Sequence, residues 1–152
     1  MSGYTENRIL IRRDYDFVFD ITNRIELWPQ LFTEYKEAEV LERIGSEILF
    51  RLTTFPEETR PSRTWVSKRT IDKANGVAVA ERVESPAPFE YMKIRWEYER
   101  LPAEGAVIMT WMQDFAVAAG VPWSNEQMES FLNRNTRAQM ASVKARVEAW
   151  ER

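Results

Sequence analysis

The stretch Arg63-Thr-Trp65-Val-Ser67-Lys-Arg69-Thr-Ile71 is the part of the sequence that says most about the fold. If it forms a β-strand, its side chains alternate between two faces, and Trp65, Ser67 and Arg69 share one of them. The face with the tryptophan is expected to be buried, yet it also carries a guanidinium, which is always charged and rarely buried without a partner. We therefore predict that this strand lines a hydrated interior cavity with aromatic walls.

The residues before this strand predict one strand, two short helices and two further strands. Asp14 belongs to the residue types that cap helix N-termini, Asn23 is placed to end the first helix, and Pro29 interrupts the second or sets a turn. A tight link at Ile44-Gly45-Ser46 joins the two further strands. The expected bounds are Glu6–Arg13 for the first strand, Asp14–Asn23 and Ile25–Phe32 for the helical segments, Tyr35–Glu42 and Glu47–Thr54 for the next strands, and about Pro56–Pro61 for a loop.

The residues after it predict three more strands and a long helix. Asn75-Gly76 is a strong hairpin signal, and the clean alternation of the Met92 segment is typical of a strand with one buried face. Ser124 and Gln127 fit a capping box at the helix start. The expected strands are Val77–Glu84, Met92–Arg100 and Val107–Phe115, and the inward stripe of the helix is Met128, Leu132, Asn135, Thr136, Gln139, Val143, Val147 and Trp150.

Together these elements predict one α+β domain over residues 1–152. A sheet of about seven antiparallel strands is strongly twisted, so a single long helix cannot cover it flat and packs into its concave face. The gap between the helix and the sheet is then the predicted interior cavity.

The composition excludes several classes of function. The net charge of −3 gives no reason to expect a nucleic-acid or membrane partner, and no run reaches the roughly 18 apolar residues that span a bilayer. We therefore expect a cytoplasmic protein. The chain has no cysteine and no histidine, which removes disulfides, thiolate catalysis, sulfur-bound zinc and the commonest general base. It also lacks a phosphate-binding glycine loop, so we expect no metal and no organic cofactor.

Each inward polar residue has a structural alternative. Arg69 could form a buried ion pair with Glu37 or Glu81. The amides of Gln113, Asn135 and Gln139 could be satisfied core groups, and the tryptophans could be plain core. Four elements, however, deliver hydrogen-bonding groups toward the same aromatic interior, which a sealed core rarely does. The adjacent carboxylates lie on loops or solvent faces and predict no glycosidase-like acid pair.

Several ordered blocks of sequence together resemble one family. They are residues Asp20–Glu39, Trp65-Val-Ser67-Lys-Arg69, Arg82-Val-Glu84, Phe89-Glu-Tyr91-Met92 leading to Trp96, Trp111-Met-Gln113, Leu132-Asn133 and Thr136-Arg137-Ala138. At this spacing the chain resembles, end to end, the aromatase/cyclases of bacterial aromatic (type II) polyketide biosynthesis, most closely the tetracenomycin type. The resemblance implies the helix-grip fold of START and Bet v 1-like domains, in agreement with the element order above.

The resemblance also implies a reaction and a site. A linear poly-β-ketone attached to an acyl carrier protein, with other type II polyketide synthase components as further partners, would undergo an intramolecular aldol closure and dehydration to an aromatic ring. Arg69 and Tyr35 would be the acid/base and carbonyl-orienting groups. The residues implied to contact the substrate are Trp28, Phe32, Trp65, Ser67, Arg82, Met92, Trp96, Trp111, Gln113, Asn135 and Gln139.

The chain departs from the family pattern at two places. Gln139 stands where the family helix often has asparagine, and the turn from Glu84 to Phe89 is one residue longer. Chain length and ring position therefore stay open. The alternative function is a non-catalytic carrier of a lipid, sterol or quinone, because the same fold serves both roles.

Overall fold

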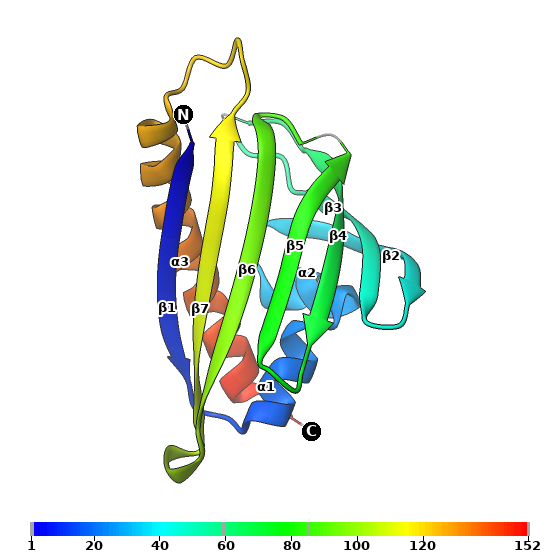
Figure 1. Cartoon of the computed structure of the whole chain (residues 1–152), viewed down its shortest axis with the longest axis vertical. Coiled ribbons are helices and arrows are strands. Elements are labelled where there is room, and N and C mark those ends of the chain that lie inside the picture. Colours follow the sequence, from blue (N-terminus) through cyan, green and yellow to red (C-terminus); the bar gives the residue numbers. More distant parts are fainter. Residues whose placement is uncertain (1, 59, 85, 152) are drawn as a thin grey trace.

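Seven antiparallel strands form a single curved sheet, in the order β1-β7-β6-β5-β4-β3-β2 (Figure 1). The computed structural model describes residues 2–58, 60–84 and 86–151. The strands are β1 Gly3–Ile11, β2 Tyr35–Ile44, β3 Glu47–Thr54, β4 Thr64–Asp72, β5 Val77–Glu84, β6 Phe89–Leu101 and β7 Ala106–Val117. The predicted helix-grip fold with its meander of six strands after two short helices is confirmed.

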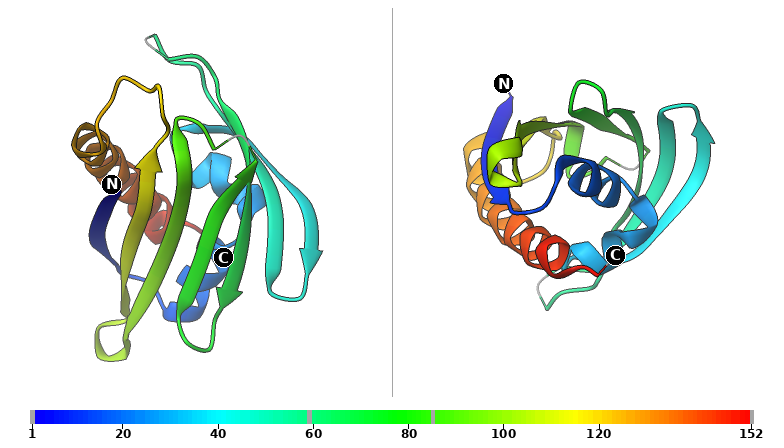
Figure 2. Two further views of the ribbon diagram at one scale, coloured as in Figure 1. Left: turned by 45° about the horizontal axis from the view of Figure 1, so that its top comes forward. Right: turned by 90° about the horizontal axis from the view of Figure 1, so that it is seen from below.

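The long helix α3, Asn125–Ala149, runs beside the edge strand β1 on the concave side of the sheet (Figure 2). Its side chains bind the free backbone groups of that edge: Glu148 accepts from Arg12 N at 2.7 Å, and Lys144 Nζ donates to Leu10 O at 2.6 Å. The helix therefore covers a sheet edge that would otherwise be open to pairing with another chain.

Short helices follow β1: α1 lies near the lower end of the molecule in Figure 1, and α2 lies further up, toward β2. They are α1 Tyr15–Thr22, the 3₁₀ turn η1 Ile25–Leu27 and α2 Trp28–Leu31, and a second 3₁₀ turn, η2 Pro102–Glu104, links β6 to β7. Asp14 caps α1 by accepting from Phe17 N at 3.2 Å, as predicted. No helix in the described ranges is long and apolar enough to cross a membrane.

The structure corrects three of the predicted element bounds. The first strand runs from Gly3 to Ile11 rather than from Glu6 to Arg13, because Arg13 turns away and donates to the carbonyl oxygens of Val147 and Trp150 at the end of α3. The helical segment from Ile25 divides into η1 and α2, and proline lies in the first turn of α2, where no backbone donor is needed. The sixth strand starts at Phe89, not Met92.

The buried apolar residues form two clusters rather than one. The larger lies under α1 and α2 and includes Phe19, Met140 and Val147. The smaller includes Phe115 and Met128 near the start of α3. Residues of both clusters line the cavity described below, so the space between helix and sheet is only partly filled by side chains.

Two glycines in hairpin turns have a left-handed backbone but differ in how closely other atoms surround them. Gly76 has φ 66° and Gly45 has φ 60°. A Cβ on Gly76 would lie 2.8 Å from Tyr98 O, whereas one on Gly45 would meet nothing within 4 Å. Both alanine variants bear the left-handed backbone cost of about 1–2 kcal/mol, but Gly76→Ala adds a clash with backbone. We expect a clearly lower melting temperature for Gly76→Ala than for Gly45→Ala; equal melting temperatures would contradict this packing.

Candidate active site

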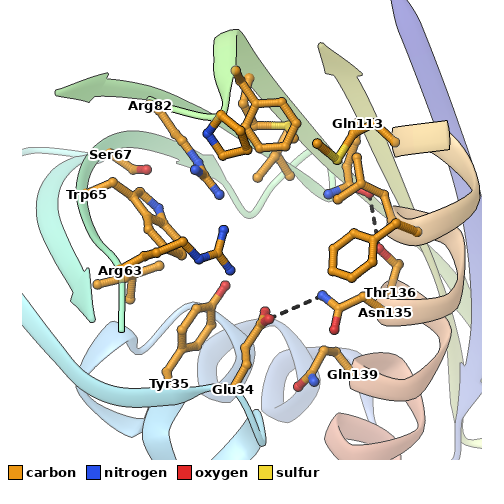
Figure 3. A pocket seen from close by; sticks show the side chains of 18 of the residues that line it. Glu34, Tyr35, Arg63, Trp65, Ser67, Arg82, Gln113, Asn135, Thr136 and Gln139 are labelled. Atoms are coloured by element: carbon orange, nitrogen blue, oxygen red, sulfur yellow. Dashed lines mark hydrogen bonds between the residues drawn. The ribbon is translucent and has the colours of Figure 1, made fainter. Parts of the chain in front are cut away.

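A cavity of about 710 Å³ lies between α3, the short helices and the inner face of the sheet. All thirteen residues predicted from the sequence as site residues line it: Trp28, Phe32, Tyr35, Trp65, Ser67, Arg69, Arg82, Met92, Trp96, Trp111, Gln113, Asn135 and Gln139. Figure 3 shows the polar members approaching the same space from several elements. The predicted interior cavity with Trp65, Arg69, Trp96 and Trp111 on its wall is therefore confirmed, while the roles of these residues stay predictions.

Arg69 is more deeply buried than the sequence predicted. Only 1% of it is exposed, and its guanidinium lies 4.2 Å from the ring centre of Trp96 and 5.4 Å from that of Trp28. Its Nε donates to Asn23 Oδ1 at 3.0 Å, and its Nη2 is buried without a hydrogen-bond partner. Arg69 therefore lines the cavity from a buried position between aromatic rings, and the hydration of the cavity stays a prediction.

The alternative of an ion pair with Glu37 or Glu81 is wrong. Both glutamates are exposed, and no ion pair among the described residues includes Arg69. Burial lowers the pKa of Arg69 to about 10, against a smaller opposing effect of Tyr98. At neutral pH the group is still a cation, and it has no carboxylate beside it.

A second arginine, Arg82, lies further along the cavity. Its guanidinium is 3.9 Å from the Trp65 ring centre, and its Nε and Nη1 are buried without partners. The guanidinium of Arg63 lies 5.7 Å from the ring centre of Trp65 as well. Figure 3 shows the guanidinium groups of Arg63 and Arg82 extending toward Tyr35. Burial lowers the pKa of Arg82 to about 10; Tyr35 opposes this shift and Arg63 adds to it.

Tyr35 forms part of the aromatic wall between these arginines. Its ring stacks on Trp28 at 5.9 Å and meets Trp65 edge-on at 6.2 Å. Burial raises the pKa of the Tyr35 hydroxyl well above its ordinary value, and the neighbouring Glu34 raises it further. The phenol is therefore a proton donor at neutral pH, not a phenolate base.

The tryptophans are both core and cavity wall. Trp96 and Trp111 stack with ring centres 4.6 Å apart and planes at 11°, and Trp28 stacks on Trp96 at 5.8 Å. The indole Nε1 of Trp111 is buried with no hydrogen-bond partner. A buried N–H without an acceptor is unusual in a folded protein, so this wall offers one more donor to a ligand.

The three amides differ in how far the protein itself satisfies them. Gln113 accepts through its oxygen from Thr5 and Thr136 at 2.7 and 3.0 Å, so its amide nitrogen faces the cavity (Figure 3). Gln139 is bound at both ends by Thr33, which supports the structural alternative for this residue. Asn135 is satisfied in part, because its amide nitrogen donates to Glu34.

Glu34, which the sequence analysis did not select, crosses the cavity to meet Asn135. Asn135 Nδ2 donates to Glu34 Oε2 at 3.2 Å (Figure 3). Glu34 is the one acidic residue among the described residues that line the cavity. It lies between α2 and β2, where no periodic pattern indicates which way a side chain points.

Loop residues at the cavity mouth were missed for the same reason. Arg60 of the β3–β4 loop lies 4.7 Å from the ring centre of Phe131 on α3, and Trp123 of the β7–α3 loop meets that ring edge-on at 5.6 Å. All three residues line the cavity. Two loops and the start of α3 therefore form its mouth.

The fold and this site define a helix-grip domain with an interior ligand cavity, and comparison with known proteins gives its family. The family model for polyketide cyclases/dehydrases and lipid transport proteins matches residues 11–144. A protein of Streptomyces cyaneus, whose name describes it as a candidate polyketide cyclase, is 45% identical over 97% of this chain and 95% of its own length. The chain belongs to the polyketide cyclase/dehydrase and lipid transport family.

Solved structures show the same fold. The ZhuI aromatase/cyclase from Streptomyces sp. R1128 superposes with a TM-score of 0.86 at 20% identity, over 97% of this chain and 94% of that one. A START superfamily protein from Mycobacterium smegmatis gives a TM-score of 0.79 at 14% identity, over 95% of this chain and 97% of that one. At this level of identity the two structures support the fold and not a particular substrate.

The ionisation of Tyr35 can be measured directly. Because burial and Glu34 both raise its pKa above 10, we expect the tyrosinate absorbance that appears near pH 10 to be the same in the wild type and in Tyr35→Phe. The two curves should separate only at higher pH, while the protein is still folded by circular dichroism. A separation at or below pH 10 would show that the hydroxyl is not held in its neutral form.

Proposed function

We propose that this protein is a polyketide aromatase/cyclase, which folds a linear poly-β-ketone and catalyses its regiospecific intramolecular aldol closure and dehydration to an aromatic ring. The observation that carries the proposal is a set of buried nitrogen donors without acceptors on the cavity wall: Arg69 Nη2, Arg82 Nε and Nη1, and Trp111 Nε1. A poly-β-ketone has a carbonyl oxygen on every second carbon, so it can supply acceptors at several depths of one cavity.

The same donors argue against a simple carrier of an aliphatic lipid or sterol, while a quinone, with only two carbonyl oxygens, would satisfy fewer of them than a poly-β-ketone. Leaving a buried donor unsatisfied costs about 1–3 kcal/mol, and more for a charged group. An aliphatic ligand would leave these groups unsatisfied, whereas a chain of ketones would satisfy them. The aromatic rings around them exclude water, which strengthens each charged hydrogen bond to a substrate oxygen.

The proposed chemistry begins with the acidity of the substrate. A methylene between two ketones loses a proton readily, to water or hydroxide, once the neighbouring carbonyl oxygen is held by a cation. Arg69 is that cation, and it stabilises the enolate oxygen and then the alkoxide formed when the enolate carbon attacks a second carbonyl carbon. The alkoxide takes a proton from Tyr35, directly or through water, which gives the aldol alcohol.

Dehydration then restores conjugation. The alcohol leaves as water when Tyr35 protonates it, while the carbon beside it gives up a proton to water, so a carbon–carbon double bond replaces the carbon–oxygen bond. Tyr35, reprotonated from solvent, suits this role because its raised pKa keeps it protonated. Arg82, Trp111 and the free amide nitrogen of Gln113 would hold other ketone oxygens. Choosing one closure among many is mainly a matter of restricting the bound conformations.

The proposed partners follow from the substrate. A reactive poly-β-ketone is presented on an acyl carrier protein by a type II polyketide synthase, and the mouth formed by Arg60, Trp123 and Phe131 is where such a tether would enter. We further propose that residues 1–152 act as one domain and that the protein works in the cytoplasm beside the synthase.

The test of this proposal is product formation with a minimal type II polyketide synthase. We expect the protein to shift the mixture from spontaneously cyclised shunt products to one first-ring-aromatised product, identified by mass spectrometry and NMR. A carrier would bind the chain or a lipid without changing the products. An unchanged product mixture with folded protein would therefore reject the cyclase proposal.

Arg69→Met separates chemistry from packing. Methionine keeps most of the side-chain volume between the tryptophans and removes the charge, whereas alanine would also leave a void. We expect a loss on the order of 100-fold in the rate of first-ring formation, as for loss of an oxyanion donor, with the fold retained. The matched control is Arg95→Met on the exposed side of β6, where Arg95 pairs with Glu97 at 2.7 Å; its rate should stay unchanged.

A further inference from the structure

We propose that Asn23 is a positioning residue for Arg69, and that a neutral amide in this place orients the guanidinium without cancelling its charge. The proposal rests on the cyclase function above for its catalytic consequence. Its structural part stands on the hydrogen bonds of Asn23 alone, so the two parts can be tested separately.

The orientation of the Asn23 amide is determined by its own partners. Asn23 follows the last turn of α1, and its Nδ2 donates to Phe19 O at 2.9 Å and to the Tyr98 hydroxyl oxygen at 3.0 Å. Both partners accept through oxygen, so a flipped amide would place two oxygens against its own. Oδ1 therefore points the other way, where it accepts from Arg69 Nε at 3.0 Å.

Tyr98 in turn is held so that it can accept from Asn23. Thr22 Oγ1 donates to Val18 O at 2.7 Å, which leaves its oxygen to accept from the Tyr98 hydroxyl 2.8 Å away. The Tyr98 proton thus goes to Thr22 and its lone pair to Asn23. Burial raises the pKa of Tyr98 to about 12, so this chain of bonds carries no negative charge at neutral pH.

The consequence for Arg69 is a single orientation. One edge of the guanidinium is bound at Nε by Asn23, and one face lies on Trp96 at 4.2 Å. Rotation about the side chain would break both contacts, and Nη2 is left as the donor without a partner. A carboxylate at position 23 would also accept from Nε, but it would lose the bond to Phe19 O, and it would pair with the cation and weaken its attraction for a substrate oxygen.

The experiment compares Asn23→Ala, Asn23→Asp and Tyr98→Phe with wild type. Three quantities are measured for each: the melting temperature, the NMR signal and hydrogen exchange of the Arg69 Nε–H group, and kcat and KM for first-ring formation. The matched control is Tyr15→Phe, since this tyrosine also donates its hydroxyl within the protein, in its case to Lys73 O, and packs beside Tyr98 without bonding Arg69.

The expected results differ among the variants. Asn23→Ala should lose the protected Arg69 Nε–H signal and on the order of 100-fold in kcat, the size of effect that misplacement of a catalytic group produces, with a smaller change in KM. Asn23→Asp should keep the Nε–H signal and still lose kcat. Tyr98→Phe should weaken the signal and lower kcat less than Asn23→Ala, and Tyr15→Phe should change neither.

Two results would overturn the proposal. One is an Asn23→Ala protein in which the Arg69 signal is unchanged, whatever happens to kcat, because Asn23 would then act only in the fold. The other is an Asn23→Asp protein with wild-type kcat, because the rate would then not depend on whether the partner of Arg69 Nε is neutral or charged. If Asn23→Ala does not fold, Asn23→Ser, which keeps a small polar side chain but removes the Oδ1 acceptor, decides the first point, because Tyr98 also interacts with Arg69 directly. If the wild type forms no ring, the cyclase proposal fails, and the NMR comparison still tests the positioning.

Discussion

The site depends on one constraint: Arg69 is buried on the inner face of the sheet and forms no ion pair with any other residue that the structure describes. Removing Arg69 from water is costly, and ordinary proteins meet that cost with a carboxylate. Here the compensation comes from neutral groups: the Asn23 amide at 3.0 Å and the face of Trp96 at 4.2 Å. These neutral groups do not cancel the positive charge of Arg69. The charge is therefore available to attract an oxygen of a molecule bound in the cavity.

The cavity itself follows from the geometry of one helix against a curved sheet. α3 is tied to the edge strand β1 by Glu148 and Lys144, so it cannot move inward to fill the concave side. The remaining space is lined by residues of two apolar clusters, and the larger cluster contributes the tryptophans Trp28, Trp65, Trp96 and Trp111 to its wall. Rigid stacked rings keep this space open because they cannot collapse into it as flexible aliphatic side chains can.

The family combines cyclases with lipid transport proteins, and the chemistry of the cavity wall is what distinguishes the two roles in this chain. An apolar cavity alone would suit either role. The unsatisfied donors of Arg69, Arg82 and Trp111 suit a ligand with several carbonyl oxygens. Tyr35, held neutral, adds a proton donor within the same wall. In the proposed reaction, binding and chemistry would use the same groups, and the main difficulty would be choosing one folded substrate conformation.

Much of the fold could be predicted from the sequence because its signals are local. The two-residue period of β4 and β6 determines which side chains face inward, and Asp14 and Ser124 mark helix starts through bonds that span three residues. Inward-facing strand and helix positions such as Trp65, Arg69 and Gln113 lie on the cavity wall for the same reason, whereas residues such as Phe32 and Arg82 were implied by the resemblance to the family.

What only the tertiary structure decided is which residues from distant elements meet. The sequence indicated that Asn23 ends a helix, but not that it binds Arg69, 46 residues away. Likewise nothing local pairs Glu34 with Asn135, 101 residues away, or brings Arg60 to Phe131. Periodicity determines the face on which a side chain lies, since that depends on backbone geometry alone. The partner of a buried charge depends on how the whole chain packs, and so it was determined only when α1 closed against the sheet.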